Sequence, residues 1–353
     1  MYEKKTTTQL NQERLDRRLP LGAPDSGRRY EKGDQIGRGG QSDVYRCHDL
    51  MLDRDVAIKF LRRDLMGNRD AENRIVREAR VMARLRSSNV PEVHDIDRSV
   101  IGCPFFAMTL VEGQDLRHIL HEIRAGVSMT QRQFPLERLL SILCDVVDVL
   151  ASAHELGVSH SDIKGENILI DQQNTTWLID WGNAELIEDE NDSDREACAK
   201  SFHGSPAYAS PEQVSGGKTD ARSDVYGVGA VLYDCLALDT LIKANSRKAA
   251  IADSLRGEHI PPSQCSLRHQ VPRDLEAICM KAVARDPAER FQDAQSLSIA
   301  LRDSLCELLV RDDLETAFEV DRPEVTSSTD NDGSARSLNC HATDPRRLVT
   351  TLG

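Results

Sequence analysis

A polar loop next to apolar segments constrains this chain more than any other part of its sequence. The loop lies within His160–Ile170, between a long amphipathic run, Leu136–Leu156, and a β-branched apolar run. Burying such a loop is costly unless its polar groups have partners. The carboxylate of Asp162, with Lys164 two residues on and Asn167 five residues on, suits proton acceptance, charge neutralisation and metal ligation. The spacing therefore predicts a site of chemistry at this loop.

Asp180 is a second candidate, at the end of the apolar strand pattern Trp177–Ile179 and shortly before Gly182. Carboxylate oxygen is the ligand that a hard cation such as Mg²⁺ prefers. Alone, Asp180 also fits an ordinary aspartate that starts a turn. Its short separation from Asn167 favours the magnesium interpretation.

A glycine-rich run, Gly37-Arg38-Gly39-Gly40, lies near the start of the chain. Glycines let backbone amides approach a phosphate closely, but a hairpin turn is the more common explanation of such a run. A dinucleotide-binding turn needs a helix directly after it. Here a strand pattern, Asp43–His48, follows. The run is therefore predicted to be a hairpin lid.

Lys59 ends the alternating apolar run Val56–Ile58. By itself such a lysine favours an outward-pointing side chain. A functional lysine needs a carboxylate partner, and Glu78 is the natural candidate, because it lies near the middle of the next helical pattern and faces roughly where Ile75 and Met82 face.

The chain is predicted to be α+β, with a small antiparallel β-rich lobe followed by a larger, mainly helical lobe. Residues 1–29 are read as a flexible polar arm and 306–353 as an acidic, mostly disordered tail, although Leu314–Val320 could extend the preceding helix. Short strands are expected over 30–61, 91–96 and 104–111, and helices over 71–85, 136–156, 221–238, 273–284 and 294–309.

Composition excludes several classes of function. Lys and Arg total 45 against 58 Asp and Glu, a net charge of −13, which argues against a nucleic-acid partner. The nine cysteines are scattered and contain no C-x-x-C pair, which indicates reduced thiols in a cytoplasmic protein. His154 begins a zinc-protease-like string, but Val158 stands where its second histidine is needed. The most apolar stretch is interrupted by Asp145 and Asp148, so no membrane insertion is expected.

These motifs occur in the order found in the eukaryotic-like (Hanks-type) serine/threonine protein kinases, and the chain resembles the soluble bacterial members of that family over about residues 30–305. The resemblance implies a bilobal kinase fold, with an N-lobe over about 30–109 and a C-lobe over about 112–305. It also implies transfer of the γ-phosphoryl group of ATP to Ser or Thr hydroxyls of protein substrates, with Mg²⁺. A homodimer for autophosphorylation is a further expectation from this resemblance.

The resemblance assigns a role to each motif residue. Asp162 would be the catalytic base, Lys164 would neutralise the γ-phosphate, Lys59 would hold the α- and β-phosphates, and Glu78 would pair with Lys59. Asn167 and Asp180 would bind Mg²⁺. The ATP site would comprise Ile36, Gly37, Gly39, Val44, Ala57, Lys59, Met108, Thr109, Val111, Asp115 and Leu169.

Other positions follow the same pattern. Glu212 would pair with Arg290, and Asp224 would brace the catalytic loop from a buried helix. Ser161 departs most from the family, because it occupies the place of the arginine that binds a phosphate on the activation segment. Phosphorylation of that segment, for example at Ser201, is therefore expected to matter less.

Two alternatives remain beside an active protein kinase. A pseudokinase scaffold would lack one of the four residues Lys59, Asp162, Asn167 and Asp180, and all four are present. A small-molecule kinase of the aminoglycoside or choline type shares the two aspartates and the asparagine, but it typically lacks the Ser210-Pro211-Glu212 segment.

Overall fold

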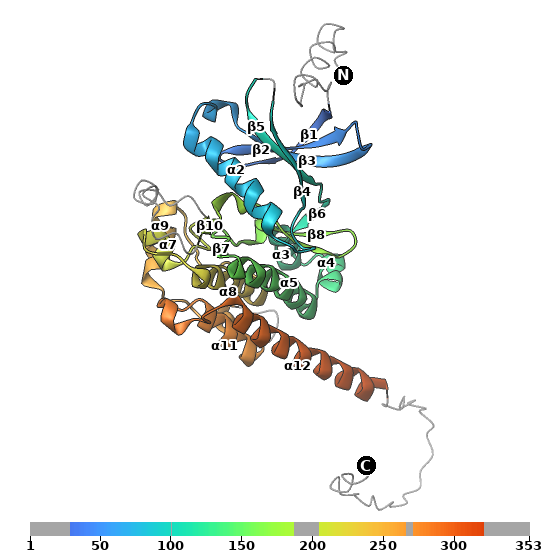
Figure 1. Ribbon diagram of the computed structural model, residues 1–353. Coiled ribbons are helices and arrows are strands. Elements are labelled where there is room, and N and C mark those ends of the chain that lie inside the picture. The colour runs from blue at the N-terminus through green and yellow to red at the C-terminus, as the bar shows by residue number, and fades with distance from the viewer. Residues whose placement is uncertain (1–28, 100, 187–204, 266–270, 321–353) are drawn as a thin grey trace, which may run out of the picture. The chain divides into compact units, whose positions relative to one another are not determined.

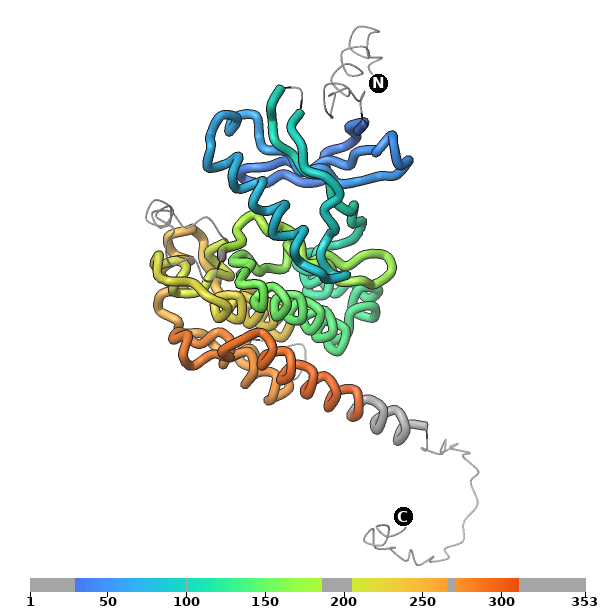
Figure 2. Tube along the Cα trace, viewed as in Figure 1, coloured from blue at the N-terminus to red at the C-terminus, as the bar shows by residue number. Residues whose placement is uncertain are grey.

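The computed structural model describes residues 29–99, 101–186, 205–265 and 271–320, with the backbone alone for 311–320 (Figure 1). A five-stranded antiparallel sheet crossed by one long helix forms the N-terminal lobe, and the C-terminal lobe is mainly helical. Figure 2 follows the chain from the sheet, in blue to teal, into the helices, in green to red. The predicted bilobal α+β fold is confirmed.

The N-terminal sheet has the strand order β1-β2-β3-β5-β4, and all neighbouring strands are antiparallel. Its first three strands form an antiparallel meander within the range 30–61, where the sequence predicts short strands. The strands are β1 (Tyr30–Arg38), β2 (Ser42–Asp49), β3 (Arg54–Leu61), β4 (Val93–Arg98) and β5 (Pro104–Thr109).

Alternation along β3 decides which way its lysine faces. Ile58 and Phe60 belong to a buried cluster on one face of the sheet, together with Phe105 and Ala107 of β5. Successive residues of a strand point to opposite faces. Lys59 therefore faces the other side, where helix α2 lies.

Helix α2 (Arg69–Arg84) begins at the cap Asn68, whose side-chain oxygen accepts hydrogen bonds from the backbone N–H groups of Asp70 (3.0 Å) and Ala71 (3.2 Å). Such a cap satisfies N–H groups that the first turn leaves unpaired. The buried face of the helix consists of Ala71, Ile75, Glu78, Ala79, Val81 and Met82. Glu78 is the one charged residue on this face.

Helix α8 (Ala221–Ala237) forms the centre of the C-terminal lobe. All of its residues from Ser223 to Ala237 are buried, as expected of a helix that is covered on every side. It packs against α5 and α11. The other helices are α3 (Leu116–Ala125), α4 (Ser128–Gln133), α5 (Leu136–Glu155), α7 (Pro211–Ser215), α9 (Arg247–Arg256), α10 (Pro262–Cys265), α11 (Arg273–Ala282) and α12 (Ala294–Val320).

Two small sheets pair strands that precede the polar loop with strands that follow it. They are the sheet β6-β8-β9 and the pair β7-β10. Their strands are β6 (Gly113–Asp115), β7 (Val158–Ser159), β8 (Ile168–Asp171), β9 (Thr176–Leu178) and β10 (Glu185–Leu186). The described 3₁₀ turns are η1 (Arg63–Leu65), η2 (Gly165–Asn167), η3 (Trp181–Asn183) and η4 (Pro287–Glu289).

Helix α12 continues past residue 306, where the tail was predicted to begin, as far as Val320. The chain divides into two units, residues 1–310 and 311–353. The N-terminal arm, the acidic run 188–196, Ser201 and the rest of the tail lie outside the described residues.

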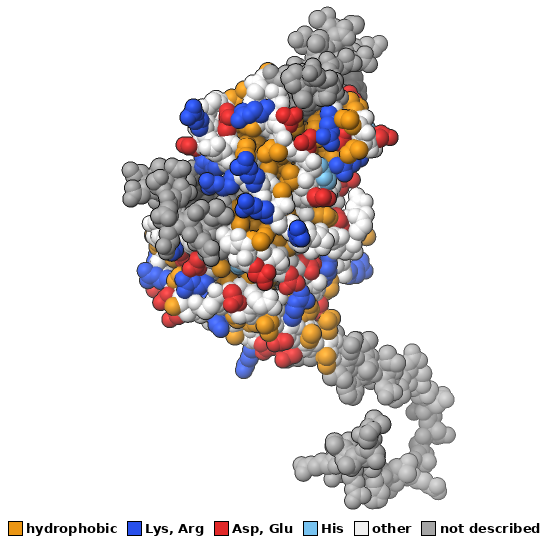
Figure 3. Space-filling model, in the orientation of Figure 1, with side chains coloured by type: hydrophobic (Ala, Val, Ile, Leu, Met, Phe, Trp, Pro, Cys, Tyr) orange, Lys and Arg blue, Asp and Glu red, His pale blue; other side chains and the backbone are white. Residues whose placement is uncertain are grey.

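Charged side chains of both signs are interspersed on the face of the molecule drawn in Figure 3, with small groups of apolar side chains between them. Exposed large apolar residues include Met51 in the turn after β2 and Met129 in α4. Among the described helices, none combines the length and the hydropathy needed to cross a membrane.

Candidate active site

Lys59 is the point at which the two lobes meet. Its Nζ lies 2.5 Å from Oε1 of Glu78 and 2.8 Å from Oδ1 of Asp180, and its side chain is only 8% exposed. The pairing with Glu78 that helix periodicity allowed is thus present. Asp180 comes from the loop after β9, so one ammonium group joins strand β3, helix α2 and the C-terminal lobe.

The charges at this junction shift two pKa values. Burial lowers the pKa of Lys59, but the carboxylates of Glu78 and Asp180 outweigh burial and keep it above its ordinary value. The charge of Lys59 lowers the pKa of Asp180 to about 2, against the opposing effect of burial. Lys59 is therefore a fixed cation and Asp180 a fixed anion at neutral pH.

Asp162, Lys164 and Asn167 lie together in the loop between β7 and β8. Lys164 Nζ is 2.6 Å from Asp162 Oδ2, and the side-chain amide of Asn167 donates to the backbone oxygen of Asp162 (2.8 Å). The turn η2 gives Asn167 this orientation. Asp162 is buried, so only a few groups contact its carboxylate.

Ser205 is an additional member of this group that the sequence did not single out. Its backbone N–H donates to Asp162 Oδ1 (3.2 Å), and its hydroxyl accepts from Lys164 Nζ (3.2 Å). Ser205 begins the segment that leads into α7. The loop that carries Asp162 and this segment are therefore joined at the carboxylate.

The loop that contains Asp162 is held by Asp224 of α8, as predicted. The backbone N–H groups of His160 and Ser161 each donate to its carboxylate at 2.8 Å. Nε2 of His154 lies 2.9 Å from the same carboxylate, so this histidine, excluded as a zinc ligand, braces the loop. Burial raises the pKa of Asp224, and these hydrogen bonds, chiefly that of His154, bring it below its ordinary value.

Two non-glycine residues of the site have left-handed backbone conformations, which are uncommon and costly. They are Ser161 (φ 64°) and Asp180 (φ 62°). The two N–H bonds to Asp224 fix the first. The second is followed by Trp181, whose ring lies 4.6 Å from that of His160 between centroids. Packing and hydrogen bonds around both residues maintain the strain.

The described residues fit a magnesium ion that is bound partly through phosphate. They contain no cluster of three or more His, Cys, Asp or Glu side chains able to hold a metal alone. Mg²⁺ in nucleotide sites needs only one or two protein oxygens beside the phosphates. Asn167 uses its nitrogen for Asp162, which leaves its carbonyl oxygen for a cation, and Asp180 offers a carboxylate. Both remain predicted ligands.

The predicted nucleotide residues lie on elements around this junction. Gly37 pairs with Val44 across β1 and β2, and Gly39 closes the hairpin by donating to Ser42 (2.7 Å). Ala57 pairs with Met108 across β3 and β5. The other predicted residues are Ile36 in β1, Thr109 at the end of β5, Val111 after it, Leu169 in β8 and Asp115 at the end of β6.

Asp115 also has a structural role. Its side chain accepts from the backbone N–H of His118 (2.8 Å) and so caps α3. One oxygen of the residue expected to reach the ribose is therefore already engaged in a helix cap.

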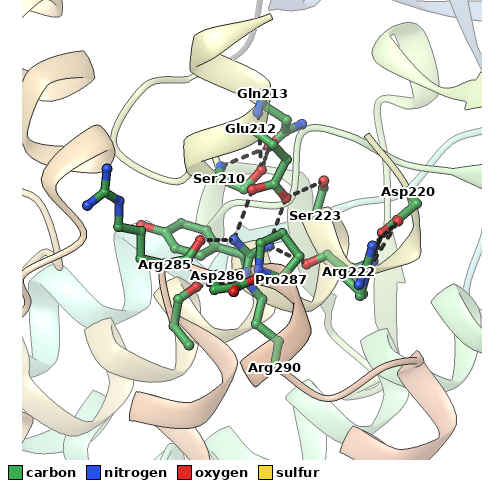
Figure 4. A network of polar contacts seen from close by, with 12 residues as sticks. Ser210, Glu212, Gln213, Asp220, Arg222, Ser223, Arg285, Asp286, Pro287 and Arg290 are labelled. Atoms are coloured by element: carbon green, nitrogen blue, oxygen red, sulfur yellow. Dashed lines mark hydrogen bonds and ion pairs between the residues drawn. The ribbon is translucent and has the colours of Figure 1, made fainter. Parts of the chain in front are cut away.

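Figure 4 shows the network around Glu212 and Arg290, whose pairing was predicted. The two side chains form two hydrogen bonds, at 2.7 and 2.9 Å, and that of Arg290 is fully buried. The guanidinium also donates to three backbone oxygens, those of Ala284, Arg222 and Arg285. This contact fixes α7 against the loop that precedes α12.

Comparisons with known proteins agree with this geometry. Residues 30–300 match the protein kinase domain family. The chain is 35% identical to serine/threonine-protein kinase PknB of Mycobacterium leprae over 278 residues, 78% of this chain and 42% of the relative. It is 32% identical to the probable serine/threonine-protein kinase CE0033 of Corynebacterium efficiens over 303 residues, 84% of this chain and 44% of the relative.

The chain thus spans less than half the length of these relatives. The match nevertheless covers the sheet, the catalytic loop and the helices that hold it. From this match and the identities above, the chain belongs to the protein kinase family, as its motifs implied.

Proposed function

We propose that the chain is a serine/threonine protein kinase that transfers the γ-phosphoryl group of ATP to hydroxyl groups of protein substrates. One observation carries the proposal: Lys59 is paired with both Glu78 and Asp180 at 2.5 and 2.8 Å, beside an intact Asp162, Lys164 and Asn167. The names of the relatives support serine and threonine as acceptors.

In the proposed reaction, a bond forms between the substrate oxygen and the γ-phosphorus while the bond from that phosphorus to the β–γ bridging oxygen breaks. Asp162 orients the hydroxyl and accepts its proton. Lys59 and Lys164 offset negative charge on the phosphates. Such electrostatic stabilisation, with positioning, provides most of the rate enhancement in phosphoryl transfer. Bound Mg²⁺ would supply further charge neutralisation beside Asn167 and Asp180.

The test is transfer of label from γ-labelled ATP, with Mg²⁺, to a basic protein substrate, followed by identification of the phosphorylated residues. Lys59→Met and Asp180→Asn should each abolish transfer, because the first removes a cation at the phosphates and the second removes a predicted carboxylate ligand of Mg²⁺. Lys243→Met is a matched control, since that lysine is exposed and pairs only with Asp239 in the described structure. Wild-type transfer no greater than that of the two site variants would refute the proposal.

The same samples separate an active kinase from a pseudokinase scaffold. A scaffold would bind a fluorescent ATP analogue without transferring phosphate, whereas we expect both. Autophosphorylation between two copies predicts that the wild-type chain labels the inactive Lys59→Met chain in a mixture of the two. A Lys59→Met chain that stays unlabelled in such a mixture would contradict a reaction between copies. We further propose a cytoplasmic location, on the basis of the reduced thiols expected from the sequence.

A further inference from the structure

Arg62, the residue that follows strand β3, contacts the turn between β1 and β2. Its Nη1 donates to the backbone oxygen of Gly40 at 3.3 Å, and its backbone N–H donates to the backbone oxygen of Gln41 at 2.9 Å. Both acceptors belong to the glycine-rich turn that the sequence predicts as a hairpin lid. One residue thus contacts two successive carbonyl groups of this turn, once through its backbone and once through its side chain.

The guanidinium of Arg62 is held in place by a second contact. Its Nε and Nη2 donate to the two carboxylate oxygens of Asp64, each at 3.0 Å. This planar pair of hydrogen bonds leaves Nη1 for the carbonyl of Gly40. Asp64 lies in η1, which begins directly after Arg62, and the backbone oxygen of Arg62 accepts the N–H of Leu65 at 3.0 Å. The side chain of Arg62 therefore links η1 to the glycine-rich turn.

This side chain approaches the turn from the face of the sheet opposite to Lys59. Arg62 has extended backbone angles (φ −62°, ψ 142°), so the alternation of β3 continues to it. It therefore lies on the face of Ile58 and Phe60, which belong to the buried cluster of the N-terminal sheet. Lys59 lies on the other face, where it pairs with Asp180. The proposed phosphate site is on that other face.

The contact with Gly40 also sets the direction of the next N–H group. The carbonyl of Gly40 and the N–H of Gln41 belong to one planar, trans peptide unit, so they point in opposite directions. Because Arg62 holds the carbonyl on its own face of the sheet, the N–H of Gln41 is directed to the face of Lys59. That N–H has no acceptor among the described residues. It is a donor that a ligand can use.

Packing alone does not fix the direction of this peptide unit. A Cβ at Gly40 would meet nothing within 4 Å, so the backbone there has open space around it. Glycine also adopts more backbone conformations than other residues. Among the described residues, Arg62 provides the one hydrogen bond that the carbonyl of Gly40 accepts. The orientation of the Gln41 N–H therefore depends on Arg62.

Resting on the proposed kinase activity, we propose that Arg62 is a positioning residue for ATP, which directs the backbone N–H of Gln41 towards the phosphates. Backbone N–H groups of such turns bind phosphate oxygens. A donor whose direction is set before binding costs less conformational entropy when the ligand arrives. Arg62 acts through the turn and makes no contact with the nucleotide itself.

The test compares Arg62→Met with the wild-type chain, first by phosphoryl transfer at varied ATP concentration. Methionine keeps an unbranched apolar side chain and removes the donors. KM for ATP should rise about 3- to 10-fold, the usual effect of one hydrogen bond. The N–H of Gln41 contacts phosphate both before and during transfer, so kcat should change by less than about 2-fold. Arg62→Lys keeps one donor for Gly40 and should lie between the two chains.

Binding provides a readout that does not need activity. The probes are adenosine and the β,γ-methylene analogue of ATP, both measured by titration calorimetry. In Arg62→Met the affinity for the analogue should fall about 3- to 10-fold. The affinity for adenosine should stay the same, because adenosine carries no phosphate. Arg63→Met is the matched control, since Arg63 is adjacent and exposed and its side chain has no hydrogen bond or ion pair among the described residues. It should bind both probes as the wild-type chain does.

An affinity of Arg62→Met for the analogue within about 2-fold of the wild-type value overturns the proposal, as does an equal loss for adenosine. If Arg62→Met does not fold by circular dichroism, Asp64→Asn decides, because it loosens the guanidinium and should cause a smaller loss for the analogue alone. A wild-type chain that binds the analogue but transfers no phosphate refutes the proposed function, and the binding comparison then decides on Arg62. A wild-type chain that does not bind the analogue overturns both.

Discussion

Replacing Arg290 by Met is expected to destabilise the C-terminal lobe strongly. The side chain is fully buried, and its partner Glu212 is 14% exposed. The substitution keeps an unbranched side chain but leaves the largely buried carboxylate of Glu212 without its ion-pair partner. Breaking a buried pair in this way costs about 3–5 kcal/mol. For a domain of this size, that loss lowers Tm by about 6–20 °C.

The assay is thermal unfolding followed by circular dichroism, at pH 7.5 and again at pH 4. Arg222→Met is the matched control, because Arg222 belongs to the same network (Figure 4) but pairs with Asp220 at the surface, both side chains being 31% exposed. Such a pair contributes about 0–1 kcal/mol. The control should therefore shift Tm by only a few degrees.

The measurement at pH 4 tests whether the unpaired carboxylate of Glu212 causes the loss of stability. In the wild-type chain, burial opposes the effect of Arg290 and Ser223, which together keep the pKa of Glu212 below its ordinary value. Its stabilising contribution is therefore present above the unfolded pKa and is lost as the pH falls. Without Arg290 the carboxyl of Glu212 can take up a proton. The difference in Tm between the wild-type chain and Arg290→Met should therefore be smaller at pH 4. The double variant Glu212→Gln/Arg290→Met should recover part of the deficit at pH 7.5. A loss under about 3 °C, or no recovery, would refute the reasoning.

Three further outcomes follow from the structure. Asp234→Asn should raise Tm more at pH 8 than at pH 5. Burial raises the pKa of Asp234 in the folded chain to about 7, so the wild-type chain loses stability as the pH rises towards that value. Equal shifts in Tm at the two pH values would contradict this. Gly113→Ala should lower Tm by several degrees, because its Cβ would meet the backbone oxygen of Ile170 at 2.2 Å, and an unchanged Tm would contradict the close approach. Ser201→Ala should retain transfer within about 3-fold, since Ser161 lacks the charge that binds a phosphate; a 10-fold loss in labelled-ATP transfer would show otherwise.

The pairing of Lys59 with Glu78 could be predicted because a local periodicity, of the strand or of the helix, sets the direction of each side chain. Alternation in β3 turns Lys59 towards α2, and the helical repeat turns Glu78 towards the sheet. The sequence also predicts the group formed by Asp162, Lys164 and Asn167, because one short loop contains all three. Local geometry sufficed in both cases.

The surroundings of Asp234 could not be found in this way. Asp234 lies in a helix whose neighbouring residues, Tyr233 and Cys235, give no periodic pattern, because α8 is buried on every side. Its meeting with Arg117 and Glu166 depends on how α3 packs against η2, which no local pattern records.

The role of Asp224 has a consequence for how the catalytic loop opens. Its carboxylate, in the most buried helix of the lobe, holds the backbone N–H groups of His160 and Ser161 at 2.8 Å. These amides cannot reach solvent unless the contact with α8 breaks, and that contact belongs to the core. Their hydrogen exchange should therefore require the free energy of global unfolding rather than that of a local fluctuation. The loop proposed to perform the chemistry is, by this measure, among the slowest parts of the molecule to open.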